Sequence, residues 1–190
     1  MLLSGALTYL LETVFHLFVL AALLRFFMQV LRAPFRNPLG DAVLAMTNWA
    51  VRPVRRVVPG LFGLDLATLL IAFVARWLWL LAEVAIAGSA IDGPSLGWLA
   101  LHALVALFKA SLWLLMGAVI LQALLSWLAP YGPMAGVLNA LTFRFLRPIR
   151  RVVPLVGGQV DLSPLILIVL CQLVLLLPVM WVEQALRGGI

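Results

Sequence analysis

Residues 52–59 read RPVRRVVP and residues 147–154 read RPIRRVVP, so one arginine and proline pattern occurs twice, 95 positions apart. Two further identical pairs keep the same spacing upstream, which are Pro38 with Pro133 and Thr47 with Thr142. Downstream, Asp65 recurs as Asp161 after one inserted residue. Self-similarity at a fixed period predicts two copies of one structural unit. The duplication therefore decides how the rest of the chain is divided.

The composition is that of a membrane protein. The chain has 190 residues, of which 65% are hydrophobic and 11% charged, whereas a soluble domain is about half apolar and about a quarter charged. The net charge of +6 then indicates basic segments facing an anionic leaflet. The lone Cys171 excludes an intrachain disulfide. No Walker A, G-x-S-x-G or H-E-x-x-H sequence occurs, so no enzyme activity, metal or other cofactor is predicted.

Four apolar stretches are long enough to cross a bilayer as helices, which takes roughly 20 apolar residues. They cover residues 4–31, 66–90, 98–128 and 162–182. The first lacks a basic N-terminal region and is longer than a cleavable signal, so we expect it to remain as a span. The sequence therefore predicts an all-α membrane protein with four transmembrane helices.

The arginines set the expected orientation. Nine lie between the first and second or the third and fourth spans: Arg32, Arg36, Arg52, Arg55, Arg56, Arg144, Arg147, Arg150 and Arg151. The connection at residues 91–97 carries Asp92 and no basic residue. The positive-inside rule puts both arginine-rich segments in the cytoplasm and both termini outside. Residues 1–90 then form a first helical hairpin, residues 91–97 an external linker, and residues 98–190 a second hairpin parallel to the first.

The motif arginines have helical spacing. In each repeat, three of them at i, i+3 and i+4 share one face of a helix. Their planar guanidinium groups suit bidentate contacts with phosphate. These candidate headgroup or partner contacts are Arg52, Arg55, Arg56, Arg147, Arg150 and Arg151. Because each basic side chain near an anionic surface contributes about 1 kcal/mol, we expect the motifs to contact anionic phospholipids.

Prolines and capping residues are expected to form the turns and caps of each motif, and Pro53 and Pro148 are expected at turns. Pro59 and Pro154 lack an amide proton and should interrupt a helix. Asp65 is the candidate N-cap of the second span. In the second repeat either Asp161 or Ser163 could cap, and the proline that follows favours Ser163.

A shorter amphipathic stretch precedes each motif. The residues sharing a helical face are Leu39, Val43 and Met46 in the first repeat, and Met134, Val137 or Leu138, Leu141 and Phe145 in the second. Apolar residues at this spacing beside arginines are typical of a helix in the headgroup region. Two roles stay open: anchoring of the cytoplasmic ends, which is favoured, and specific docking of a lipid or protein.

The doubled motif resembles the YggT family of bacterial integral membrane proteins, which has YlmG-like and chloroplast relatives, over about residues 5–182. The matching residues are Arg52, Pro53, Arg55, Arg56, Pro59 and Asp65, then Arg147, Pro148, Arg150, Arg151, Pro154, Asp161 and Ser163. The family commonly has Asn-Pro in both repeats, where this chain has Asn37-Pro38 and Gly132-Pro133. The resemblance implies a non-enzymatic inner-membrane protein. It connects the chain with osmotic-shock tolerance and cation handling, membrane-complex assembly, or nucleoid and division organisation.

Four charged residues lie inside the predicted spans: Glu12, Arg76, Glu83 and Lys109. Charges in hydrocarbon are costly, so they indicate either function or structural pairing. On one interpretation these residues line a polar seam between the repeats that conducts an ion. On the favoured interpretation Arg76 and Lys109 pair with Glu12 and Glu83 to fix helix packing, because cation pathways usually show carboxylates without a neutralising partner.

Two hypotheses follow for function. The favoured one is a membrane scaffold, or an assembly and stress-tolerance factor, whose basic motifs hold anionic lipid or a membrane-protein partner. The alternative is a small-cation channel or transporter component linked to osmotic-shock tolerance. Four spans leave little room for a pore within a single chain, so a homo-oligomer is also plausible. Nucleic-acid binding is not expected, because the nine arginines are split between two short segments without a binding module.

Overall fold

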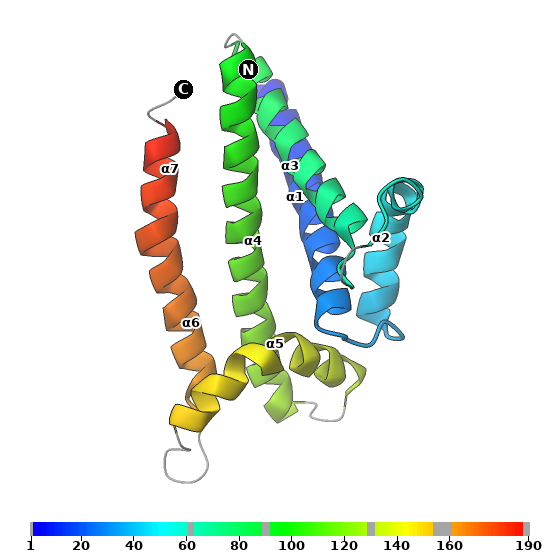
Figure 1. Ribbon diagram of the computed structural model, residues 1–190, viewed down its shortest axis with the longest axis vertical. Coiled ribbons are helices and arrows are strands. Elements are labelled where there is room, and N and C mark those ends of the chain that lie inside the picture. Colours follow the sequence, from blue (N-terminus) through cyan, green and yellow to red (C-terminus); the bar gives the residue numbers. More distant parts are fainter. Residues whose placement is uncertain (1, 61–62, 89–91, 129–131, 154–160, 188–190) are drawn as a thin grey trace.

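The computed structural model describes residues 2–60, 63–88, 92–128, 132–153 and 161–187, and each of its elements is a helix (Figure 1). In chain order these are α1 (Leu2–Val30), α2 (Pro38–Arg55), α3 (Leu66–Ile86), α4 (Gly93–Leu128), α5 (Pro133–Val152), α6 (Ser163–Val174), a π-helical segment (Leu175–Val179) and α7 (Met180–Arg187). The last three follow one another without a break and form one long rod.

Four stretches of helix are long and apolar enough to cross a membrane: Gly5–Val30, Leu66–Ile86, Gly93–Ser126 and Ser163–Leu186. The predicted all-α class and the four predicted spans are thereby confirmed. One boundary differs, because α4 already begins at Gly93 and the segment expected as a linker, residues 91–97, is mostly helical. Asp92 builds this start: its carboxylate accepts a hydrogen bond from the Ser95 backbone N–H at 2.9 Å, which satisfies a free donor at the helix start.

Helices α1 and α3 pack along each other in the first half (Figure 1). Their contact contains the buried side chains of Ala22, Leu23, Ala72 and Ala75. Small residues let two helix backbones approach closely, which favours association where surrounding hydrocarbon supplies no hydrophobic driving force. Leu107 of α4 joins the same cluster, so α4 is packed against the first half as well as its own.

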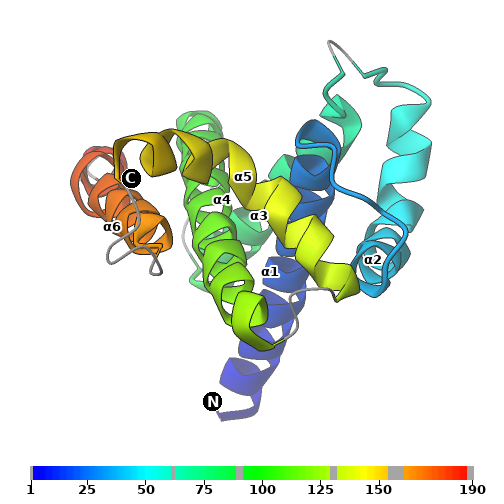
Figure 2. The same ribbon diagram turned by 90° about the horizontal axis from the view of Figure 1, so that it is seen from below.

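In the second half α4 lies against α5, α6 and α7. Met116 and Val119 of α4 pack with Leu146 of α5 and with Leu167 and Cys171 of α6. Viewed from below, α5 crosses beneath the long helices (Figure 2). It thereby also reaches the end of α1, with which it forms a further buried cluster of Met28, Ala33, Val137 and Leu141.

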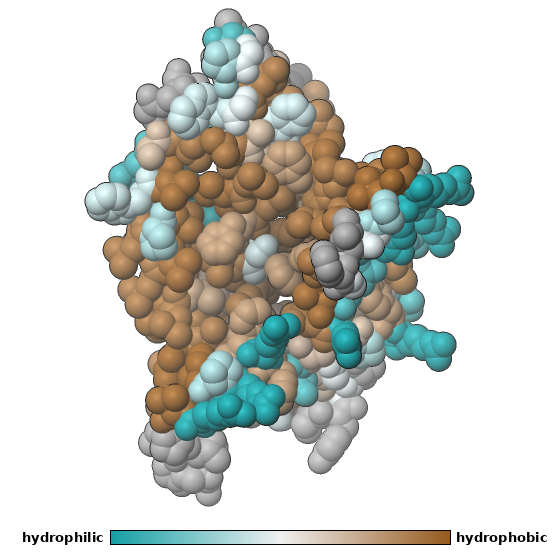
Figure 3. Space-filling model, viewed as in Figure 1, coloured by the Kyte–Doolittle hydropathy of each residue, from teal (hydrophilic) through white to brown (hydrophobic). Residues whose placement is uncertain are grey.

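Polar and apolar side chains are separated on the surface of the molecule. Helix α1 begins and α7 ends at one end, whereas α5 and the start of α2 lie at the other (Figure 1). The end of α2 lies partway up the long helices (Figure 1). Hydrophobic surface covers much of the long helices, and hydrophilic side chains gather around α2 and α5 (Figure 3). The basic motifs therefore lie on the two short helices, apart from the apolar surface of the four long ones.

The start of α2 is locally specified. The Asn37 side chain accepts a hydrogen bond from the Gly40 backbone N–H at 2.9 Å, and Pro38 is the first helical residue, a position that suits proline. A Cβ on Gly40 would collide with the backbone carbonyl of Phe35, so this position requires glycine. Helix α5 follows Gly132, at the position where α2 follows Asn37, and it has no side-chain cap. Glycine has no side chain to accept the hydrogen bond that Asn37 accepts in the first repeat.

The first proline of each motif lies inside a helix rather than at a turn, contrary to expectation: Pro53 in α2 and Pro148 in α5. Each helix continues for only a few residues beyond it, as expected where an amide donor is lost. Helix α2 ends at Arg55, ahead of Pro59, and Pro154 falls outside the described residues. The motif arginines therefore occupy the last turns of the two short helices.

Candidate functional site

The same ion pair forms in both motifs. The Arg55 guanidinium contacts the Asp65 carboxylate, and Arg150 Nε lies 2.9 Å from Asp161 Oδ2. The two arginines are equivalent in the repeat, and so are the two aspartates. Each pair ties the last turn of a short helix, α2 or α5, to the start of the next long helix.

The two aspartates also cap the long helices. Asp65 accepts hydrogen bonds from the backbone N–H and the hydroxyl of Thr68, and Asp161 accepts one from the backbone N–H of Ser163 at 2.9 Å. Burial opposes the charged form of Asp65, but bonds from Thr68 and Arg55 outweigh it and hold the pKa of this carboxyl below its usual value. For Asp161, burial is likewise outweighed by bonds from Ser163 and by the nearby guanidinium, and its pKa is also lowered.

The favoured capping residue of the second repeat was wrong. Ser163 is the first residue of α6 rather than its cap. Its hydroxyl is buried and has no hydrogen-bond partner within the described ranges. Asp161 takes the capping role because it lies two residues before the helix and its carboxylate reaches the Ser163 N–H. Asp65 caps α3 as predicted.

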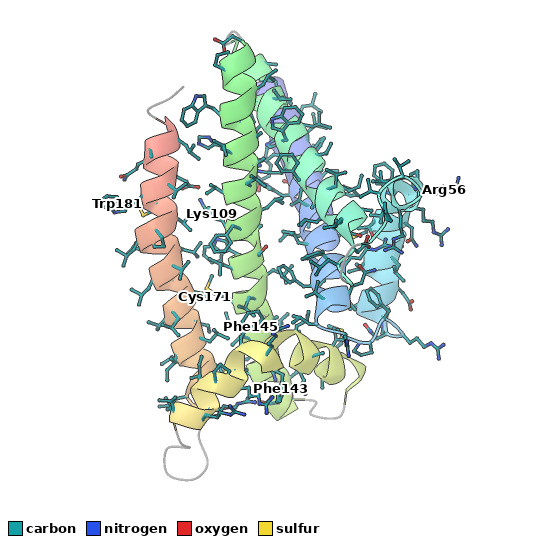
Figure 4. All side chains as sticks on the ribbon, viewed as in Figure 1. Arg56, Lys109, Phe143, Phe145, Cys171 and Trp181 are labelled. Atoms are coloured by element: carbon teal, nitrogen blue, oxygen red, sulfur yellow. The ribbon has the colours of Figure 1, made fainter. Side chains whose placement is uncertain are left out.

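The other motif arginines are unpaired. Arg52, Arg56, Arg147 and Arg151 are exposed, and none forms an ion pair with a carboxylate in the part of the chain that the structure describes. Arg56 points away from the helices (Figure 4). Arg147 lies 5.9 Å from the centre of the Phe143 ring, a cation–π distance that leaves the guanidinium available to an anion.

The predicted face of three equivalent arginines is therefore divided. The middle arginine of each motif is held by an aspartate that the pattern of helical spacing could not place, since it lies beyond the end of the helix. The outer two present free guanidinium groups to the surroundings. Chemically, this arrangement can bind phosphate or carboxylate groups by charge and bidentate hydrogen bonds.

Each half also contains a fully buried threonine bonded to its first long helix. Arg25 Nη1 donates to the Thr47 hydroxyl at 2.8 Å, and the Thr142 hydroxyl is bonded to the Gln122 carboxamide. Sequence reasoning matched the two threonines but missed Arg25 and Gln122, because these partners do not recur at the repeat spacing. These bonds fix α2 to α1 and α5 to α4.

The charges within the long helices pair differently from the favoured prediction. Lys109 Nζ lies 2.6 Å from Glu183 Oε1, between α4 and α7 (Figure 4). Sequence reasoning had not assigned Glu183 a partner. The pairing depends on how the rod containing the π-helical segment and Pro178 lies against α4, which spacing along the sequence does not reveal.

Arg76 contacts a histidine rather than a carboxylate. Its Nη1 lies 3.2 Å from His16 Nε2, and the other ring nitrogen of His16 lies 3.8 Å from Glu12. Glu83 accepts a hydrogen bond from the Trp79 indole at 2.6 Å. Neither Glu12 nor Glu83 is therefore the partner of Lys109 or the direct partner of Arg76.

A cavity of about 520 Å³ opens between the two halves. Its polar lining comes from α1, α3, α4 and α7 and consists of His16, Arg76, His102, Lys109 and Glu183. Two of the four predicted intramembrane charges are thus brought together there, and the other two lie outside the lining. Among the described residues no three metal-ligating side chains gather at one place.

Comparisons with known proteins bear on the repeat. The family model described as CCB3/YggT matches residues 4–86 and, again, residues 101–182. No catalytic family is indicated by this match or by the relatives below. No solved structure matches the chain significantly.

Several bacterial relatives match most of the chain. An uncharacterised protein of Pseudomonas aeruginosa is 34% identical over 86% of this chain and 83% of its own length. One of Vibrio alginolyticus is 34% identical over 87% and 89%, and the uncharacterised protein YggT of Escherichia coli is 32% identical over 90% and 87%. The resemblance read from the doubled motif is confirmed, and the chain belongs to the CCB3/YggT family.

Proposed function

We propose that this protein is a non-catalytic scaffold of the bacterial inner membrane, whose two basic motifs hold anionic lipid headgroups at the cytoplasmic surface. In this proposal two parallel hairpins cross the bilayer with both termini outside. The observation that carries it is the pair of exposed, unpaired arginines at the end of each short helix: Arg52 and Arg56, Arg147 and Arg151.

The short helices have the form of surface helices. Each buries one apolar side against the long helices, with Val43 and Val51 in α2 and Val137 and Leu141 in α5 among the buried residues. The exposed sides mix polar and apolar residues, with Trp49 exposed in α2 and Phe143 in α5, and the last turns carry the exposed arginines. A helix of this type beside arginines suits the interface between headgroups and acyl chains, which supports an interfacial role for α2 and α5.

The ion pairs give the arginines of each motif two different roles. Arg55 and Arg150 hold the end of each short helix to the capping aspartate of the next long helix. The orientation of the outer arginines is thereby set before any lipid arrives. Four such arginines at about 1 kcal/mol each contribute roughly 4 kcal/mol of attraction to an anionic surface, enough to enrich anionic lipid around the ends of the two short helices.

The test compares two variants that lose the same charge. The double variant Arg56→Gln/Arg151→Gln removes one unpaired arginine from each motif, and the control Arg36→Gln/Arg144→Gln removes two exposed arginines outside the motifs. Both are placed in bilayers of mixed phosphatidylglycerol and phosphatidylcholine, and the lipids retained on extraction are quantified. We expect the motif variant to retain clearly less phosphatidylglycerol than the control. Equal retention would contradict the lipid assignment.

A protein partner is a distinguishable outcome of the same variants. If the arginines hold an acidic segment of another membrane protein, capture from native membranes will lose that partner in the motif variant while lipid retention stays unchanged. The same capture, combined with cross-linking, reports whether a second copy of this chain is present. The identity of the captured partner would then indicate whether the protein acts in membrane assembly or in stress tolerance.

The alternative of a small-cation pathway draws little support from the cavity. Its lining has two basic side chains, Arg76 and Lys109, against the single carboxylate of Glu183. Cation pathways are lined by carboxylates or carbonyl oxygens, so a net positive lining disfavours cation entry. Potassium flux through the purified protein in liposomes, absent in Glu183→Gln, would reverse this judgement.

A further inference from the structure

A groove between the two halves of the molecule has a polar end and an apolar end. The polar end is the cavity that contains Arg76 and Lys109. A second cavity of about 440 Å³, lined only by apolar residues, lies between α1, α2, α4 and α5. Leu20 and Trp113 line both cavities. The two cavities therefore adjoin at these side chains along α1 and α4, and together they are called the groove.

The polar end carries one uncompensated positive charge. Lys109 is neutralised by Glu183. Arg76 contacts the His16 ring, and no carboxylate of the described residues lies within ion-pair distance of its guanidinium. Glu12 approaches only the far nitrogen of His16. A cation at this depth in a span is costly without a counter-charge, so an anion would complete the site.

The apolar end distinguishes an amphiphile from a simple ion. An inorganic anion would neutralise Arg76 but would leave the apolar cavity below it without an occupant. An acyl chain fits that cavity chemically, because aliphatic side chains and the Trp113 ring form its walls. A ligand with one charged part and one apolar part would occupy both cavities.

We propose that this groove holds one anionic phospholipid, with its phosphate at Arg76 and an acyl chain in the apolar cavity beside Trp113. The planar guanidinium matches two phosphate oxygens, and net negative charge on the headgroup balances the excess positive charge. The site lies along α1 and α4, with α2 and α5 closing its apolar end, and it does not include the basic last turns of those two helices. A negative result for this site would therefore leave the function proposed above unaffected, and the reverse also holds.

The experiment uses the full chain in nonionic detergent and a lipid that reports contact with tryptophan. Phosphatidylglycerol with brominated acyl chains quenches a tryptophan that its chain touches, and Trp113→Phe isolates the part of the signal due to Trp113. We expect saturable quenching of Trp113 by brominated phosphatidylglycerol at lower concentration than by brominated phosphatidylcholine. Dodecyl phosphate should relieve the quenching, whereas inorganic phosphate should have little effect.

Two variants test the two ends of the groove separately. Arg76→Gln should weaken phosphatidylglycerol binding by on the order of 10-fold, the effect of losing a charged hydrogen-bond donor, and should leave phosphatidylcholine binding nearly unchanged. Gly117 lines the apolar cavity, and a Cβ there would meet no atom within 4 Å. Gly117→Phe should therefore fill the cavity and abolish quenching by either lipid, and Gly117→Ala is its matched control.

The contrary outcomes are equally specific. Equal binding of the two lipids by the native protein, or unchanged phosphatidylglycerol binding in Arg76→Gln, would overturn the headgroup assignment. Relief of quenching by inorganic phosphate as strong as that by dodecyl phosphate would overturn the lipid assignment in favour of a small-anion site. If Arg76→Gln loses its helical circular dichroism, unchanged quenching in Gly117→Phe still overturns the proposal. Quenching that persists in Arg56→Gln/Arg151→Gln would separate this site from the surface motifs.

Discussion

Removing the Asp65 carboxylate should loosen the junction between α2 and α3. Its side chain is 9% exposed, is paired with Arg55 and accepts hydrogen bonds from Thr68. Asp65→Ala removes an N-cap, which contributes about 1 kcal/mol, and a charged hydrogen bond, which contributes roughly 1.5–3 kcal/mol. Because Arg55 is 45% exposed, water screens the pair and favours the lower part of that range. We expect the free energy of unfolding to fall by about 3 kcal/mol.

Two further variants separate the cap from the charge. Asp65→Asn keeps an oxygen that can accept from the Thr68 N–H but removes the ion pair, so its loss should be smaller than that of Asp65→Ala. Asp161→Ala removes the equivalent pair, whose aspartate is 31% and arginine 40% exposed. With more solvent around both partners, its loss should be about 1–2 kcal/mol.

The assay is reversible unfolding in mixed micelles, in which the fraction of denaturing detergent is raised and the helix content is followed by circular dichroism. The order of the three losses is the informative result. An Asp65→Ala loss no larger than that of Asp161→Ala would refute the reasoning that burial strengthens the first junction. Unchanged stability in both alanine variants would refute the structural role of the two ion pairs.

Three other predictions use the same titration. The folded-state pKa of both capping aspartates is lowered, so their stabilisation is present above the unfolded pKa of about 4 and is lost as pH falls through the lower folded value; Asp65→Asn should flatten this acid slope. Thr47→Val should cost about 1–3 kcal/mol, because the buried Arg25 loses a hydrogen-bond partner, and equal stability would contradict this. Gly40→Ala should destabilise the fold through its collision with a backbone carbonyl, whereas Gly117→Ala should change stability by less than about 0.5 kcal/mol.

The sequence predicted the features that depend on local composition and spacing. Length and apolarity were sufficient to find the four long helices, because a membrane span has a minimum length. The repeated motif was sufficient to identify the family. The capping role of Asp65 was readable because a cap acts within three or four residues of itself.

The features missed depend on contacts between helices that lie far apart in the sequence. Lys109 and Glu183 are 74 positions apart, and nothing in either segment indicates the other. Arg25 and Gln122 each form a hydrogen bond with the buried threonine of their own half, but they do not occupy equivalent positions in the repeat. The division of each arginine triplet follows from an aspartate at the start of the next long helix, beyond the end of the short helix, which helical periodicity cannot represent.

The sidedness of the two basic motifs is the claim on which the account depends most, and two single thiols measure it. Val57 and Val152 are equivalent in the repeat, and each is 81% exposed beside its motif. In a background with Cys171→Ala, Val57→Cys and Val152→Cys are treated in intact cells with a membrane-impermeant maleimide, with the exposed Gly93→Cys as the external control. We predict that both motif thiols react only after permeabilisation, while the control reacts before it. Reaction of either motif thiol in intact cells would contradict the shared cytoplasmic location.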